Sequence, residues 1–135
     1  MDSLEQYTWL IAIITIAFCF SCFGNGSNDV ANAYATSVAA RTLSIWQAGF
    51  TSVVTEFVGA VALGAGVTDT IKNKVIDPNR FTDNPGTLLL VMTCAEIGSA
   101  AWLMTANRLG FAVSTTHTIV GALVGAGIGS QANVT

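Results

Sequence analysis

The sequence has 135 residues, of which 52% are hydrophobic and only 10% are charged, with a net charge of −3. Ordinary soluble domains carry about 25% charged residues. A soluble domain of this length could not bury so much apolar surface, and a nucleic-acid-binding surface would be strongly basic, so both classes are excluded. We therefore expect an all-α, polytopic membrane protein with about four apolar spans and with broken or re-entrant helices.

The first apolar run is interrupted by a short polar stretch. Tyr7–Phe23 carries no charge and is long enough for most of a membrane span, which needs roughly 17–25 residues. It is followed by Gly24–Ala33, which begins with two glycines that permit irregular backbone. Ser27 or Asn28 could cap a new helix that continues to about Ala40. The pattern thus predicts a break between two helices at this point.

Asp29 is the most informative residue of this polar stretch. A carboxylate near the middle of a bilayer costs about 2.5–3.5 kcal/mol, so it requires a counter-charge or a bound cation. Three amides surround it in the sequence: Asn25, Asn28 and Asn32. Their oxygens suit Na⁺ and their NH₂ groups suit phosphate oxygens. The stretch therefore predicts an ion site, and the simpler alternative is an acid paired with Arg41 or Arg108.

Two further apolar runs each contain one acidic residue. Leu43–Gly66 contains Glu56, and Thr87–Asn107 contains Glu96. Between them, residues 67–86 hold both prolines and most of the cations, so this segment is expected to be a loop between spans. Glu96 matches no motif, and the sequence leaves open whether it faces solvent or a partner in the interior.

The last apolar run, Leu109–Gly129, contains four polar residues in succession at 114–117. Ser114 is a good helix N-cap, which would place Thr115 and Thr116 in the first turn. Helix N-termini bind anions through free N–H groups, so these hydroxyls and amides could surround a tetrahedral oxyanion. His117 is a candidate for a pH effect. Glycines at every fourth position from 121 to 129 predict a helix-packing face.

Several of these stretches resemble one known family, the inorganic phosphate transporters (PiT), which are sodium– or proton–phosphate symporters. Gly26–Ala33 resembles the family signature G-A-N-D-V-A-N-[AS], and Val113–Gly121 resembles its P-[VI]-S-x-T-H-x-I-V-G stretch. Glu56–Ala60 and Thr70–Lys72 also match. The resemblance covers nearly the whole chain, favours the fungal branch, and departs from the family at Ala112, where the family has a proline that fixes the helix start.

The resemblance implies a larger fold of about a dozen spans in two inverted repeats, with the substrate site between them. Residues 1–135 resemble the N-terminal repeat, so the partners expected are inorganic phosphate, the lipid bilayer and the missing C-terminal repeat or a second copy. The coupling ion would be sodium or a proton, with no other cofactor, in the plasma membrane. The residues expected to bind phosphate are Asn28, Asn32, Ser114, Thr115 and Thr116. The residues expected to bind the coupling ion are Asp29, Asn25 and Glu56.

Two other readings of the sequence compete with transport. An intramembrane hydrolase would use Ser114, His117 and Asp29, but a nucleophile needs its base oriented by a third group, and no G-x-S-x-G elbow is present. The chain is therefore not expected to be an enzyme. The second reading is a non-transporting membrane module or phosphate sensor, assembled through the glycine-rich helix faces.

Overall fold

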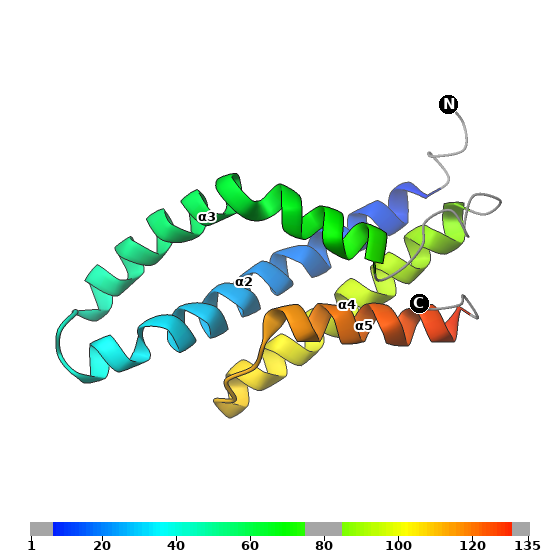
Figure 1. Ribbon diagram of the computed structural model, residues 1–135. Helices are drawn as coiled ribbons and strands as arrows, with labels where there is room; N and C mark the ends of the chain where they lie inside the picture. Colours follow the sequence, from blue (N-terminus) through cyan, green and yellow to red (C-terminus); the bar gives the residue numbers. More distant parts are fainter. Residues whose placement is uncertain (1–6, 75–84, 131–135) are drawn as a thin grey trace.

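The computed structural model describes residues 7–74 and 85–130, and within these ranges it is helical without strands. In chain order the helices are α2 (Thr8–Ala39), α3 (Ile45–Lys74), α4 (Pro85–Leu109) and α5 (Thr115–Gly129) (Figure 1). Among the described residues, α2, α3 and α4 are long and apolar enough to cross a membrane. The expected all-α, polytopic membrane class is confirmed. The 15-residue α5 extends about 22 Å, less than the roughly 30 Å of a hydrocarbon core.

The predicted break in the first apolar run is wrong. α2 is one continuous helix of 32 residues, and it passes through Gly24 and Gly26 without a change of backbone. The Ser27 hydroxyl donates to the Phe23 carbonyl inside this helix, at 2.7 Å, instead of capping a new one. Glycine permits an irregular backbone but does not require it, and the apolar stretches on both sides favour an uninterrupted span.

The expected loop at residues 67–86 is also shorter than predicted. α3 continues through Val67 to Lys74, and α4 already begins at Pro85. No glycine or proline lies between Val67 and Lys74, so nothing local stops the helix there. Proline is well suited to the first helical position because its missing N–H needs no partner there. The rest of the predicted loop, residues 75–84, lies outside the described residues.

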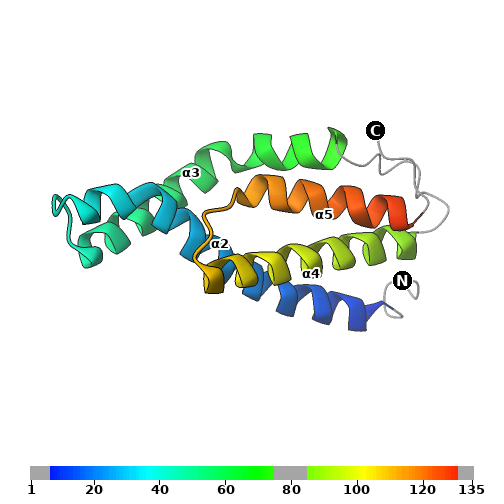
Figure 2. The same ribbon diagram turned by 90° about the horizontal axis from the view of Figure 1, so that it is seen from below.

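α4 is the central helix of the packing, with α2 on one side and α5 on the other (Figures 1 and 2). α2 buries Leu10, Ala17 and Gly24, which are spaced by seven residues, as in the seam of two closely packed helices. Gly24 brings α2 close to Leu103 of α4, because a Cβ added at Gly24 would lie 3.0 Å from the Leu103 Cβ. Small residues at a seam allow such an approach of two membrane helices.

α3 packs much less than the other helices. It contacts α2 only sparsely, and its large apolar side chains are exposed, including Phe50 at 76% and Phe57 at 71%. Glycines 121, 125 and 129 of α5 are exposed as well, with nothing near an added Cβ. The predicted glycine face therefore does not pack against the described helices. α5 packs instead through Leu123, which lies in an apolar cluster with Val91 and Ala95 of α4.

The connection from α4 to α5 is tight and has defined caps. Gly110 takes φ +71°, a left-handed conformation that suits glycine after a helix end. The Phe111 N–H then donates to the Ala106 carbonyl at 2.9 Å, which closes the last turn of α4. Residues 111–114 are not helical, and the chain turns back so that α5 runs beside α4 (Figure 2). The predicted N-cap at Ser114 is confirmed.

Candidate functional site

Asn28 of the first polar stretch joins α2 to the end of α4 and the α4–α5 connection, through partners that lie 79 to 85 residues later in the sequence. Asn28 is 5% exposed. Its Nδ2 donates to Asn107 Oδ1 and to the Phe111 carbonyl, both at 2.9 Å. Its Oδ1 accepts from the Val113 N–H at 3.1 Å and from Asn32 Nδ2 at 2.9 Å. Both donor hydrogens and both acceptor sites of the amide are thus filled by protein.

Asn107 completes this group, and the sequence reasoning did not identify it. Its Nδ2 donates to the Gly24 carbonyl at 2.8 Å, so it binds both the backbone and the Asn28 side chain of α2. We call Asn28, Asn32 and Asn107 the amide clasp. An amide at the end of an apolar run was the available signal for Asn107, but its partner lies 79 residues away in the sequence, and no spacing rule predicts such a contact.

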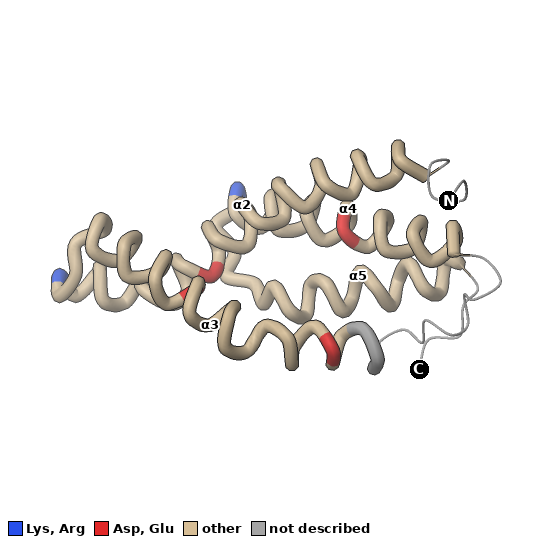
Figure 3. The backbone as a smooth tube through the Cα atoms, turned by 90° about the horizontal axis from the view of Figure 1, so that it is seen from above, with Lys and Arg blue, Asp and Glu red and all other residues tan. Residues whose placement is uncertain are grey.

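Asp29 lies beside the amide clasp and contacts the first turn of α5. The Thr115 hydroxyl donates to Asp29 Oδ2 at 3.1 Å. No ion pair is recorded between Asp29 and either arginine in the part of the chain described, so the alternative of an arginine-paired acid is not supported. In Figure 3 the basic positions lie at helix ends and the acidic positions lie along the helices. The two predicted motifs are therefore joined by a carboxylate without a charged partner among the described residues.

The start of α5 has the geometry expected of a capped helix. Ser114 Oγ accepts from the His117 N–H at 3.3 Å and lies 2.7 Å from His117 Nδ1. The Ser114–His117 contact that a hydrolase would need is thus present, but Asp29 binds Thr115 instead of orienting the imidazole. The arrangement lacks the third member of a nucleophile–base–acid series, and the serine acts as a helix cap.

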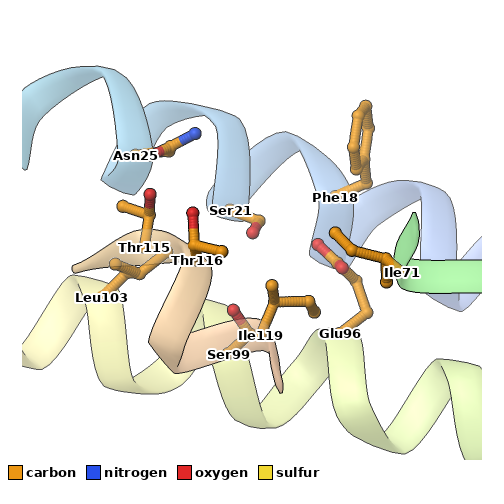
Figure 4. Close-up of a pocket in the computed structure, with 10 residues that line it drawn as sticks. All are labelled: Phe18, Ser21, Asn25, Ile71, Glu96, Ser99, Leu103, Thr115, Thr116 and Ile119. Atoms are coloured by element: carbon orange, nitrogen blue, oxygen red, sulfur yellow. The ribbon is translucent and has the colours of Figure 1, made fainter. Parts of the chain in front are cut away.

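A cavity of about 210 Å³ lies between α2, α4 and α5, and Ile71 of α3 also lines it (Figure 4). Thr115 and Thr116 of α5 and Asn25 of α2 line one end of it, and Glu96 of α4 lies toward the other. Asn25 and Thr116 form no hydrogen bond with other described residues, so their polar groups are free to meet a ligand. The remaining lining residues are apolar or carry hydroxyls: Phe18, Ser21, Ile71, Ser99, Leu103 and Ile119.

The predicted site residues therefore separate into three groups. Asn25, Thr115 and Thr116 line the cavity, and Asp29 touches it only through Thr115. Asn28 and Asn32 lie about one and two turns further along α2, where they line a second cavity of about 290 Å³ together with Asn107. Glu56 is exposed on α3, and no hydrogen bond joins it to the rest of the described site. The roles of these residues in binding stay predictions.

The comparisons with known proteins are consistent with one another. Residues 25–135 match the phosphate transporter family. The chain is 45% identical over 125 residues to a sodium-dependent phosphate transporter of Toxoplasma gondii and 46% identical over 125 residues to the phosphate-repressible phosphate permease pho-4 of Neurospora crassa. It is 43% identical over 120 residues to a sodium-dependent phosphate transporter of Plasmodium falciparum. No solved structure matches the chain.

These alignments cover 93%, 93% and 89% of the chain, but only 14%, 21% and 18% of the respective relatives. The chain thus spans about a fifth or less of the length of these proteins. A fungal protein is among them, as the motifs suggested. All three carry names of transporters or permeases and none the name of an enzyme, in agreement with the sequence analysis. The match over residues 25–135 and the two motifs that meet at α5 identify the chain as a member of the phosphate transporter family.

Proposed function

We propose that the protein takes part in secondary active transport of inorganic phosphate across a membrane, coupled to a cation. Its family membership supports this function, and the names of two relatives favour sodium over a proton as the coupling ion. The observation that carries the proposal is the hydrogen bond between Thr115 and Asp29. It joins a helix start suited to an anion with a membrane carboxylate suited to a cation.

Phosphate would bind at the N-terminus of α5. Free N–H groups and the positive end of the helix dipole favour an anion there. The Thr115 and Thr116 hydroxyls line the cavity at this end. Thr116 can donate to a phosphate oxygen, and Thr115 can do so when its single hydroxyl hydrogen turns from Asp29 to the phosphate. Ser114 would act mainly by holding the helix start. Asn28 and Asn32 were predicted to bind phosphate directly; to do so, Asn28 would have to give up one of its bonds within the amide clasp.

The coupling cation would bind at Asp29. A carboxylate cannot attract a bare anion, but a sodium ion between Asp29 and the phosphate would compensate both charges. Asn25 offers an amide oxygen at the same end of the cavity. Glu56 would join this site only in an assembly that covers the exposed side of α3. His117, whose Nδ1 lies 2.7 Å from Ser114 Oγ, is the residue that would make phosphate binding sensitive to pH.

The whole transporter would contain more than these residues. The chain corresponds to a small part of its relatives, and we propose that residues 1–135 form an N-terminal repeat that meets an inverted second repeat. The sparse packing of α3 and its exposed apolar side chains suit a helix that faces lipid or that second repeat. The plasma membrane is the proposed location.

The direct test replaces the Thr115 hydroxyl in the full-length protein reconstituted in liposomes. Thr115→Val keeps the shape of the side chain and removes its hydroxyl, so the KM for labelled phosphate should rise about 10- to 150-fold, the equivalent of a hydrogen bond to a charged group. Thr105→Val is the matched control, because Thr105 is exposed and its hydroxyl binds only its own helix, at Ala101.

The control should leave uptake within about twofold of the wild type, as expected for a surface substitution. An unchanged phosphate KM in Thr115→Val would contradict the placement of phosphate at α5. Absence of phosphate accumulation by the wild type under a sodium or proton gradient would contradict transport itself. Phosphate binding without accumulation would favour the sensor alternative, for which the unpacked glycine face of α5 offers an assembly surface.

A further inference from the structure

Glu96 is an acidic residue at the middle of a membrane span. It lies 11 residues after Pro85 and 13 before Leu109, the two ends of α4. At a rise of 1.5 Å per residue, these separations are about 17 and 20 Å. A carboxylate at this depth is a functional hypothesis by default. None of the roles assigned above to the site residues uses Glu96.

The surroundings of the Glu96 carboxyl group leave it uncompensated. Its Oε1 is buried and has no hydrogen-bond partner among the described residues. The side chain extends from α4 toward α2, into the cavity shared with Ser21 and Ser99 (Figure 4). Ile71 and Phe18 form apolar walls beside it. A buried polar oxygen without a partner calls for an explanation, and the binding of an ion or a water is one of the few available.

Two hydroxyl groups complete a possible set of oxygen ligands. Ser99 is 2% exposed and Ser21 is half-buried on the facing helix. Neither hydroxyl bonds to another described residue, so both oxygens are free to coordinate an ion. Hard cations prefer oxygen ligands, and the cavity of about 210 Å³ has room for an ion with several waters, each of which occupies about 30 Å³ in the liquid.

We propose that Glu96, Ser21 and Ser99 bind a sodium ion at a site distinct from Asp29. This inference rests on the proposed function for its purpose, because the same cavity has the α5 helix start at its other end. A sodium ion at Glu96 would then place positive charge at the end of the cavity opposite the bound phosphate. The site itself follows from the buried carboxylate and the free hydroxyls, and it can be tested without transport.

The experiment measures equilibrium binding of ²²Na⁺ to the purified full-length protein in detergent, with no phosphate present. Glu96→Gln keeps the size of the side chain and removes its charge, so the number of sodium ions bound at saturation should fall by one. Glu96→Asp should retain that ion. Ser99→Ala should raise the half-saturating sodium concentration about three- to tenfold, as expected for the loss of one ligand. Cys94→Ser, an exposed position two residues away, should bind as the wild type does.

The same sodium stoichiometry and affinity in Glu96→Gln as in the wild type would overturn the proposal, as would a wild type that binds no sodium. If Glu96→Gln fails to stay monodisperse, an unchanged affinity in Ser99→Ala overturns the proposal instead. A failure of this proposal can be distinguished from a failure of the proposed function. A wild type that binds sodium through Glu96 but does not accumulate phosphate would contradict transport alone, and a transporter with an unaffected Glu96→Gln would contradict this site alone.

Discussion

The amide clasp and the cavity next to it differ in how far their polar groups are satisfied by the protein. In the clasp, the Asn28 amide fills all its hydrogen-bonding positions with protein groups. At the cavity, Asn25, Thr116 and Glu96 form no hydrogen bond with another described residue. Polar groups with filled positions hold helices together, whereas free ones facing a cavity are available to a ligand. The difference separates residues that position the site from residues that bind.

The largest effect should come from Asp29, which is adjacent to Asn28 of the clasp and bonds to Thr115 at the cavity. Asp29→Asn keeps the size of the side chain and removes the charge that compensates the coupling cation. Uptake of labelled phosphate under a sodium gradient should fall to the background of empty liposomes, with membrane expression unchanged. Asp69→Asn is the matched control, because Asp69 is exposed on α3. Normal uptake by Asp29→Asn at equal expression would contradict the ion-site assignment.

A change in the amide clasp should affect stability more than binding. Asn28→Ala removes four hydrogen bonds, and at about 0.6–1 kcal/mol each in a membrane protein the free energy of unfolding should fall by about 2–4 kcal/mol. Asn25→Ala, at the cavity, should change it by less than about 0.5 kcal/mol. Denaturant titration of both purified variants measures this, and equal losses would mean that the clasp and the cavity do not differ in what they contribute to stability.

The smallest effects are expected at the two glycines of α2. Gly26→Ala meets open space, so it should stabilise the helix by up to about 1 kcal/mol. Gly24→Ala gains the same helix propensity but places a Cβ 3.0 Å from the Leu103 Cβ, and overpacking costs about 1–3 kcal/mol. Its net effect should be a loss of up to about 2 kcal/mol. A melting temperature raised by Gly24→Ala would show that α2 and α4 are further apart at Gly24 than this 3.0 Å separation requires.

Local chemistry determined which features the sequence could predict. The Ser114 cap was predictable because an N-cap depends only on residues within one turn, and its bond to His117 follows from that geometry. The contact between Asp29 and Thr115 could not be predicted from their spacing. It was expected only because both residues were assigned to one binding site. The break in α2 was predicted wrongly because glycine permits more backbone conformations than the structure uses.

The long-range partners could not be predicted from spacing. Asn107 lies at the end of an apolar run, and only the fold brings it to Asn28. Glu96 was recognised as a membrane acid, but whether it faced solvent or the interior depended on which side of α4 packs against α2. Residues of all four described helices line the cavity. It forms only when the chain folds, so its lining residues could not be predicted from any single segment.

The central claim is that the cavity binds phosphate and that the amide clasp holds the helices in place. The most direct measurement is the melting temperature of the purified full-length protein with and without saturating phosphate. A ligand that binds only the folded state raises this temperature. Asn28→Ala should melt lower than the wild type but keep its rise with phosphate, whereas Thr116→Val should melt as the wild type does and lose most of the rise. The reverse pattern, with the rise lost in Asn28→Ala and kept in Thr116→Val, would contradict the account.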